Sequence, residues 1–366
     1  MFKSIKIKNL RAITELEIDD LGQINLFVGQ NSCGKTTFLE AVFFLIGSTN
    51  PQLPINANVF RDLPFLSNRL WPTYFHNMDT VLPIEIFGCL RDTEEKQNLL
   101  IRPRQKEIRA TPPMHPDTTP PGYAASDSET IFESDGLRLE YTSSKDPSTK
   151  IESTIFLKGN QLITEGAKSR DIRGIFVNPF TIYNWRDRFS AIQNKKQVTE
   201  VISLLKEIEP RISDLRLNEA GLLLADIGLS ELIPANLMGG GIAKFLSIAL
   251  AMLDSRNGIV LIDEIENGLH HSAQKTIWKA IFNWALHLNV QVFATSHSNE
   301  SIKAFNNIIA TSLFETEAKL FRFERKDEKF RAVEYSKDIL AESLESDWEV
   351  RWCPTPAKAR SPVRRY

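Results

Sequence analysis

Eight residues near the start of the chain have the types and spacing of a phosphate-binding loop. Residues 29–36, GQNSCGKT, fit the pattern G-x-x-x-x-G-K-[ST]. In such a P-loop the backbone N–H groups and the N-terminus of the next helix surround phosphate oxygens, because both present positive dipole ends. Lys35 would neutralise the β- and γ-phosphates, and the Thr36 hydroxyl would bind Mg²⁺. The residues expected to contact a nucleotide are Gly29, Asn31, Ser32, Cys33, Gly34, Lys35, Thr36 and Thr37.

A second motif, which contains an acidic pair, lies far downstream in GIVLIDEIENGLHH. Four apolar residues end in Asp263 and Glu264, which is typical of a Walker B strand. Asp263 would hold the Mg²⁺ shell, and Glu264 would polarise an attacking water. An ordinary acidic turn between a strand and a helix is the alternative, and the P-loop in the same chain makes it less favoured.

Two further motifs flank this acidic pair. In VQVFATSH a buried strand delivers His297 to its C-terminal end, where ligands bind in open α/β sheets, so His297 could sense a γ-phosphate. The glycine triplet Gly239, Gly240 and Gly241 opens an apolar helix and offers a second phosphate cradle. One ATP needs only one P-loop, so a second cradle suggests a nucleotide clamped between two subunits. A structural histidine and a flexible glycine turn are the plainer alternatives.

The elements that must position these residues alternate between strands and helices. Apolar runs predict buried strands at 24–28, 174–177, 258–262 and 290–294. Helical periodicity predicts helices at 36–46, 189–208, 242–253 and 273–288. Residues 2–8 and 13–18 predict strands ahead of this core, and residues 215–217 and 222–226 predict a strand pair. The alternation indicates an α/β core with a largely parallel sheet.

Residues 48–171 differ in character from the rest. Five prolines between positions 51 and 83 exclude long helices, and several strand-like pieces predict an inserted β-rich lobe. Within it, residues 111–129 are rich in Pro, Ser and Thr, which predicts a mobile loop. The last fifteen residues, WCPTPAKARSPVRRY, hold four basic residues and no acidic one, so the stretch 346–366 is predicted to be a disordered basic tail.

Composition narrows the class of protein. A net charge of −2 gives no support to a globally basic nucleic-acid binder, although local patches could still contact DNA. The three cysteines are scattered and indicate neither a zinc site nor a disulfide framework. The longest apolar runs, 41–47 and 245–253, are too short to span a bilayer. These features predict a cytoplasmic protein without membrane contact.

The four motifs, in this order, resemble the ABC-type ATPase heads of the SMC, RecF and OLD families. The opening IKIKNLRAITELEI is similar to the N-terminal strands of that group, where an N-[FL]-R turn precedes the P-loop. ENGLHHSAQKTIWKAI and VQVFATSHSNESI resemble especially the OLD and abortive-infection (AbiL/RloA-like) branch of prokaryotic ATPases. The resemblance covers residues 1–47 and about 172–345. It implies one discontinuous P-loop NTPase head of ABC type, with a mostly parallel sheet and an N-terminal antiparallel part.

This resemblance also implies roles for the motifs. Lys35 and Thr36 would bind ATP and Mg²⁺, with Asp263 in the metal shell. Glu264 would be the catalytic base and His297 the switch. Residues 266–270 would form a D-loop that faces a second copy of the chain. Gly239–Gly241 would meet the γ-phosphate of the ATP held by that copy, since such heads dimerise on ATP and separate after hydrolysis.

The sequence departs from the family pattern at two points. Met238 stands where the signature usually has a serine, which removes a hydroxyl contact to the γ-phosphate and predicts weaker activity. The Q-loop residue is open between Gln161 and Asn178. In addition, OLD nucleases carry a carboxylate-rich TOPRIM domain, and the residues after His297 contain no such cluster, so nuclease activity in this chain is not expected.

Three functions remain in competition. The first is an ATPase switch that dimerises on ATP and controls a separately encoded effector in anti-phage defence. The second is a RecF-like DNA-binding ATPase of DNA repair. The third is a nucleotide-sensing scaffold that hydrolyses little; the intact Glu264 argues against it and Met238 slightly for it. Cys33 lies inside the P-loop, so its alkylation is expected to block nucleotide entry.

Overall fold

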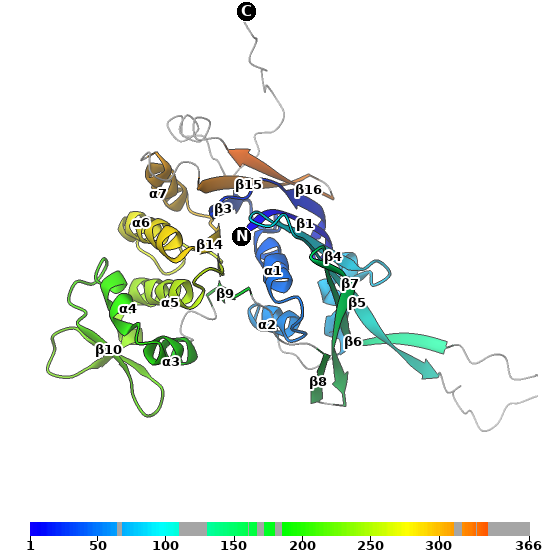
Figure 1. Cartoon of the computed structure of the whole chain (residues 1–366), viewed down its shortest axis with the longest axis horizontal. Helices are drawn as coiled ribbons and strands as arrows, with labels where there is room; N and C mark the ends of the chain where they lie inside the picture. Colours follow the sequence, from blue (N-terminus) through cyan, green and yellow to red (C-terminus); the bar gives the residue numbers. More distant parts are fainter. Residues whose placement is uncertain are drawn as a thin grey trace, which may run out of the picture.

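The computed structural model describes residues 1–63, 68–109, 130–159, 161–166, 172–179, 185–310, 317–326 and 328–335. The mobile loop predicted at 111–129 and the basic tail predicted at 346–366 lie outside these ranges. Within them, the chain forms two large sheets with helix α1 (Lys35–Ile46) between them (Figure 1).

The first sheet carries the predicted parallel core. Its strands run in the order β16 (Lys329–Tyr335), β15 (Ala318–Lys326), β3 (Ile24–Gly29), β14 (Gln291–Thr295), β13 (Ile259–Ile262) and β9 (Gly174–Val177). All neighbouring pairs are parallel except the hairpin of β15 and β16. The strands β3, β13 and β14 are buried along their whole length. Continuous apolar runs form such strands because both faces of a parallel sheet are covered.

Helices cover the two faces of this sheet. On one face lie α5 (Gly240–Asp254), α6 (His271–Leu288) and α7 (Asn299–Ile309), which share a core with the strands. On the other face lies α1, whose residues other than Thr36 are all buried. Helix α1 is apolar on more than one side because it packs against both large sheets. This burial fixes the P-loop that precedes the helix.

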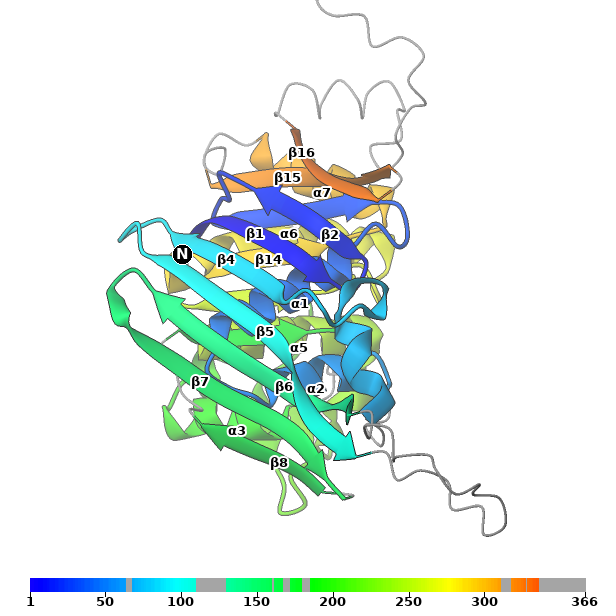
Figure 2. The same cartoon turned by 90° about the vertical axis from the view of Figure 1, so that its right-hand side faces the viewer.

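The second sheet is antiparallel and covers the far side of α1 (Figure 2). Its strands run in the order β2 (Ile13–Ile18), β1 (Phe2–Leu10), β4 (Ile84–Leu90), β5 (Lys96–Arg109), β6 (Thr130–Ser143), β7 (Asp146–Lys158) and β8 (Gln161–Gly166). The strands of the predicted β-rich lobe therefore continue the sheet that β1 and β2 begin. Two short helical stretches, α2 (Leu53–Val59) and η1 (Asn68–Tyr74), followed by η2 (His76–Met78), connect α1 to β4.

The long helix predicted at 189–208 is wrong, because the chain forms two helices there. Helix α3 (Arg186–Asn194) ends, and α4 (Val198–Leu205) begins after a break in which Lys196 takes a left-handed φ of 59°. A helix cannot continue through that backbone conformation. The predicted strand pair forms β10 (Asp214–Leu217) and β11 (Leu223–Asp226), which pair antiparallel and are followed by β12 (Ile233–Pro234) and η3 (Ala235–Met238).

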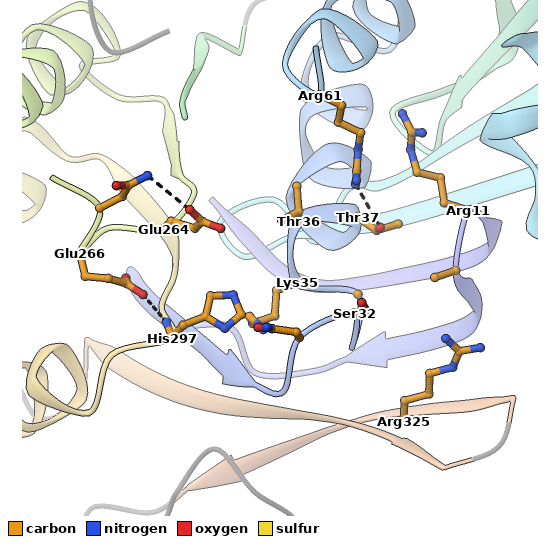
Figure 3. Close-up of a pocket in the computed structure, with 14 residues that line it drawn as sticks. Arg11, Ser32, Lys35, Thr36, Thr37, Arg61, Glu264, Glu266, His297 and Arg325 are labelled. Atoms are coloured by element: carbon orange, nitrogen blue, oxygen red, sulfur yellow. Dashed lines mark hydrogen bonds between the residues drawn. The ribbon is translucent and has the colours of Figure 1, made fainter. Parts of the chain in front are cut away.

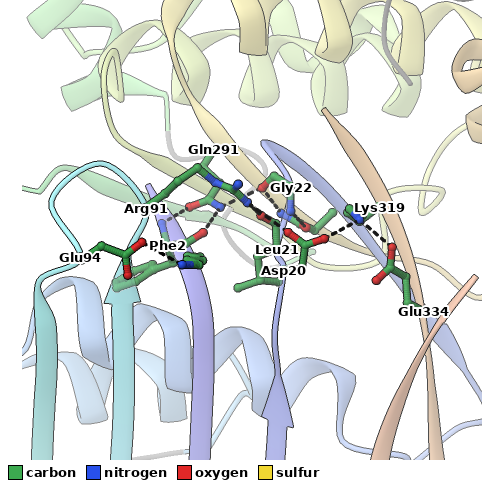
Figure 4. A network of polar contacts seen from close by, with 11 residues as sticks. Phe2, Asp20, Leu21, Gly22, Arg91, Glu94, Gln291, Lys319 and Glu334 are labelled. Carbon is green, nitrogen blue, oxygen red and sulfur yellow. Dashed lines mark hydrogen bonds and ion pairs between the residues drawn. The ribbon is translucent and has the colours of Figure 1, made fainter. Parts of the chain in front are cut away.

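The buried amide of Gln291 joins the two large sheets (Figure 4). Its Oε1 accepts a hydrogen bond from the Phe2 backbone N–H at 2.7 Å, and its Nε2 donates to the carbonyl oxygens of Phe2 and Gly22, both at 2.8 Å. Nearby, Lys319 of β15 pairs with Asp20 at 2.9 Å. The first strand of the antiparallel sheet and the start of the P-loop strand are thus held at one point.

No helix among the described residues is both long and apolar enough to cross a membrane. The division of the chain proposed from the sequence, with a head at 1–47 and 172–345 and a lobe at 48–171, stays a prediction.

Candidate nucleotide site

The P-loop closes tightly between β3 and α1. Gly29 has a φ of 143°, and a Cβ there would lie 2.6 Å from the Phe323 carbonyl oxygen and 2.9 Å from the Cys33 sulfur. Gly34, with a φ of 92°, makes the last turn before α1 begins at Lys35. Only glycine fits at position 29, because it needs both a left-handed φ and a close backbone approach. The conformation of the loop therefore explains why glycines stand at these positions of the motif.

The ammonium group of Lys35 is held inside the loop. Its Nζ donates to the carbonyl oxygens of Gly29 at 2.9 Å and Gln30 at 2.8 Å, and lies 3.5 Å from the Cys33 sulfur. Burial lowers the pKa of Lys35, since a charged form is disfavoured away from water. A phosphate group that enters the loop would give the Lys35 ammonium group an anionic partner in place of these carbonyl oxygens.

The thiol of Cys33 is also buried, with 3% exposure, and the block of nucleotide entry by its alkylation stays a prediction. Burial is the main cause that raises the pKa of Cys33, and the nearby Lys35 only partly offsets it. Since the thiolate is the reactive form and must also be reached, this thiol is a poor target for alkylating reagents.

The two predicted metal-binding residues meet at the carboxyl edge of the parallel sheet. The Thr36 hydroxyl lies 3.0 and 3.2 Å from the two carboxylate oxygens of Asp263, which follows β13. Thr295, at the end of the neighbouring strand β14, donates to Asp263 Oδ1 at 2.6 Å and accepts from the Glu264 backbone N–H at 2.9 Å. A hydroxyl and a carboxylate in this arrangement are the oxygen ligands that Mg²⁺ prefers.

Glu264 projects from a strained turn into the same cavity. Its φ of 49° is left-handed, and its carboxylate accepts a hydrogen bond from the Asn267 side chain at 3.5 Å. Burial raises the pKa of Glu264, and the neighbouring carboxylates of Asp263 and Glu266 raise it further. A raised pKa makes the carboxylate a stronger base for a water proton.

His297, just beyond β14, lines the cavity beside the P-loop (Figure 3). Its backbone N–H donates to the Glu266 carboxylate at 2.5 Å. Glu266 therefore connects the loop after β13 to the loop after β14. Sequence reasoning placed Glu266 in the expected D-loop and gave it no contact with His297.

The cavity that contains these groups has a volume of about 800 Å³, in the range of ligand sites. Of the predicted site residues, it is lined by Asn31, Ser32, Gly34, Lys35, Thr36, Thr37, Glu264 and His297, whereas Gly29 and Cys33 are not among its lining residues. Glu266 and Asn267 of the expected D-loop also line it, together with Arg11, Ala12, Arg61 and Arg325, which the motifs did not single out. Three arginines beside a P-loop add positive charge on the side of the cavity away from Glu264, as Figure 3 shows.

Two of these arginines are anchored by a buried carboxylate of helix α1. Glu40, whose side chain is 1% exposed, pairs with Arg11 at 2.8 Å and with Arg61 at 2.6 Å. A signal for this arrangement was present in the sequence: Glu40 is the single acidic residue of an otherwise apolar helix, four positions after Thr36. A buried charge almost always has a partner, so a basic residue near the P-loop could have been expected.

The two candidates for the Q-loop lie in very different places. Asn178 follows β9 and lines a smaller cavity, of about 280 Å³, together with Thr36, Asp263 and Glu264. Gln161 is exposed on β8, at the far edge of the antiparallel sheet. The geometry therefore favours Asn178 as the amide that reaches the site.

The glycine triplet stands apart from the P-loop of its own chain. Gly239 and Gly240 are exposed, and Gly239 combines a φ of 94° with no neighbouring atom within 4 Å of an added Cβ. Of the described residues that line the two cavities, none belongs to the triplet. The first backbone N–H groups of α5 have no partner within the helix, and Gly239 and Gly240 are exposed at this end, where a second molecule could reach them.

A P-loop after β3 and an acidic pair after β13, at the ends of the two strands that flank β14 in a parallel sheet, with an antiparallel sheet packed over the P-loop helix, define an ABC-type P-loop ATPase head. A solved SMC head bound to the C-terminal winged-helix domain of ScpA shares this fold, with a TM-score of 0.50, 11% identity, and coverage of 92% of this chain and 98% of that one. The predicted fold class is confirmed.

Family models cover most of the same region. Residues 1–167 match a model described as an AAA ATPase domain. Residues 92–303 match a model described as "AAA domain, putative AbiEii toxin, Type IV TA system", and the protein belongs to this AAA domain family.

Two curated proteins are similar to this chain over very different lengths. An ATP/GTP phosphatase of Helicobacter pylori is 24% identical over 90% of this chain and 94% of its own length. The DNA replication and repair protein RecF of Lactococcus lactis is 49% identical over 43 residues, 12% of each chain. The family and the phosphatase support an ATPase-type protein, whereas the RecF similarity is short.

Proposed function

We propose that the protein is an ATP-hydrolysing head that dimerises on ATP. In the dimer, the P-loop of one copy and the triplet Gly239–Gly241 of the other would enclose one nucleotide. The observation that carries this proposal is the exposed triplet, which has an open helix N-terminus and no place in the cavity of its own chain. Two copies related by a two-fold axis would complete two such sites at once.

Within each site the residues divide the chemistry among them. Lys35 and the backbone N–H groups of the loop would bind the phosphates, and Thr36 and Asp263 would hold Mg²⁺. Mg²⁺ supplies charge neutralisation at the phosphate oxygens when it is bound. Glu264 would take a proton from the attacking water, and His297, which follows the neighbouring strand β14, would contact the γ-phosphate. The lost signature hydroxyl at Met238 leaves backbone N–H groups as the donors from the partner.

We also propose a biological setting, on the basis of the sequence resemblance. We place the protein in the OLD and AbiL-like branch, as a switch for a separately encoded effector in anti-phage defence. The description of the matching family as a putative toxin of a toxin–antitoxin system supports a defence role. We expect no nuclease activity in this chain, so a partner would supply any toxic or cleaving activity.

A RecF-like role in DNA repair is the second candidate, and the 43-residue RecF similarity favours it. The charge distribution of the antiparallel sheet speaks against DNA on that face. Several of its lysines are paired with neighbouring glutamates, for example Lys6 with Glu17 at 2.8 Å and Lys8 with Glu85 at 3.5 Å. Paired lysines are poor phosphate ligands, because a phosphate must displace the carboxylate first.

Light scattering after size-exclusion chromatography tests the dimer directly. Glu264→Gln should bind ATP, turn over at least about a hundredfold more slowly, and elute as a dimer with ATP but not with ADP. Lys35→Ala should stay monomeric because it loses ATP. Glu219→Gln, which alters an exposed carboxylate, is the control and should behave as the unmodified chain does. Normal turnover of Glu264→Gln, or a monomer in the presence of ATP, would overturn the proposal.

A further inference from the structure

Lys244 is a buried lysine that none of the sequence motifs assigns. It lies on α5 with no exposed surface, in a cluster of apolar residues. Its Nζ donates to the backbone carbonyl oxygens of Asp263 at 3.2 Å and Glu264 at 3.1 Å. An ammonium group is costly to bury, so such a residue needs a structural or functional reason.

The position of Lys244 links two motifs that are far apart in the sequence. It is three residues after Gly241, so it belongs to the first turns of the helix that the glycine triplet opens. Its two carbonyl partners belong to the turn that holds Glu264 at a left-handed φ of 49°. A helix moves as a rigid unit, so a shift of the triplet would pull directly on the backbone of Glu264.

In the proposed dimer these two motifs serve different nucleotides. The triplet of one copy touches the ATP held in the P-loop of its partner, whereas Glu264 of that copy acts on the ATP in its own P-loop. Lys244 therefore lies on a covalent and hydrogen-bonded route between the two sites.

We propose that Lys244 is a positioning residue that couples the two ATP sites. When the nucleotide of the partner seats against the triplet, α5 moves and Lys244 sets the backbone of Glu264 for hydrolysis in its own site. Hydrolysis then becomes efficient only when both sites are loaded. This inference rests on the proposed ATP-dependent dimer.

Steady-state ATPase assays over a range of ATP concentrations test the coupling. The unmodified chain should show a Hill coefficient above 1. Lys244→Met keeps a long apolar side chain but removes the donor, so kcat should fall at least about tenfold and the Hill coefficient should approach 1. ATP-dependent dimer formation and the Kd for ATP should change less than about threefold, since Lys244 does not contact the cavity. Lys244→Arg, which keeps a donor, should recover part of the lost coupling.

Ser247→Ala is the matched control on the same helix. Ser247 is equally buried, accepts a hydrogen bond from the Trp185 indole N–H at 2.8 Å and donates to the Ala243 carbonyl oxygen at 2.9 Å, so neither of these two bonds involves the Glu264 turn. This variant should lose some thermal stability and keep both kcat and the Hill coefficient. Equal losses in Ser247→Ala and Lys244→Met would mean that Lys244 only stabilises the fold.

Mixed dimers keep the test decisive even if Lys244→Met is less stable. A dimer of one unmodified copy and one Lys35→Ala copy holds a single ATP, and the triplet of the unmodified copy faces an empty P-loop. When the copy that keeps Lys35 also carries Lys244→Met, the ATPase rate of this mixed dimer should fall by less than about twofold. In a dimer that holds ATP in both sites, the same substitution should lower the rate at least about tenfold. An equal fold-change in both dimers would overturn the coupling. Absence of any ATP-dependent dimer would instead overturn the proposed function itself.

Discussion

Thr295 is a residue whose single hydroxyl contacts both the side chain of Asp263 and the backbone of Glu264. It is fully buried, donates to Asp263 and accepts from the Glu264 backbone N–H. The last residue of β14 thereby fixes the turn after β13. The sequence placed Thr295 in the motif that leads to His297, without a role of its own.

Thr295→Val should impair both stability and turnover. Valine has a similar shape but leaves the Asp263 oxygen and the Glu264 N–H without this partner, and each buried unsatisfied group costs about 1–3 kcal/mol. If about 2 kcal/mol of that loss appears in the transition state, kcat falls roughly 30-fold. Steady-state ATPase assays measure the change in kcat, and urea unfolding measures the change in stability. Thr295→Ser keeps the hydroxyl and should stay within about threefold of the unmodified rate; an equally large loss in the serine variant would contradict this role.

Asn178 and Gln161 give a second comparison at the scale of single residues. Asn178→Ala should lower kcat at least about tenfold, because its amide shares a cavity with Thr36 and Glu264 and could orient a reacting water. Gln161→Ala should leave kcat within about twofold, since this residue is exposed on β8. The same ATPase assay decides between them, and a larger effect at Gln161 would reverse the assignment.

At the scale of elements, α1 is stabilised by an ionic contact as well as by apolar packing. Glu40 faces the short segment that contains Arg61 and the turn after β1 that contains Arg11. Through this one carboxylate the helix positions two of the cavity arginines. The strand β15 brings the third: it pairs with β3 so that Phe323 lies opposite Gly29, and Arg325 comes two residues later.

Glu40→Ala should destabilise the protein strongly. Removing one member of a buried ionic cluster leaves the others uncompensated, which costs about 3–5 kcal/mol in the free energy of unfolding. Equilibrium urea denaturation followed by circular dichroism measures the change. Glu17→Ala breaks the exposed pair with Lys6 and should cost less than about 1 kcal/mol. A small effect at Glu40 would mean that the arginines are held by other contacts.

Sequence patterns predicted individual strands and helices better than the contacts between distant segments. The buried strands and the helices α1, α5 and α6 were predictable, because continuous apolar runs and helical periodicity report burial directly. The break at Lys196 was not, because the same apolar spacing continues across it. The convergence of Arg11, Arg61 and Arg325 depends on strand pairing between distant segments, which no local pattern encodes.

At the scale of the whole molecule, several charges of the antiparallel sheet are paired, whereas three arginines line the nucleotide cavity. The net charge is −2, and lysines of the antiparallel sheet such as Lys6 and Lys8 are paired with glutamates. The long hairpin of β6 and β7 follows the same pattern, with Arg138 bound to Glu152 at 2.5 Å. This distribution favours a protein partner over DNA as the regulator.

Duplex DNA should therefore leave the ATPase rate within about twofold, at both low and physiological salt. Binding to DNA through phosphate contacts would be strong at low salt and weaken steeply as salt rises. ATPase rates with and without a DNA duplex, at two salt concentrations, measure this. A salt-sensitive stimulation would favour the RecF-like role.

The pairing of β3 with β14 and β15 has a consequence for the biosynthesis of the protein. The P-loop strand leaves the ribosome early, but its two sheet neighbours lie after residue 290 and residue 317. At roughly 5–20 residues per second, those partners appear about 15–60 s later. During that interval the apolar run of β3 has no sheet to join and needs shielding from aggregation. We therefore expect ATP binding only after these late strands have been made, because the P-loop follows a strand that needs both neighbours.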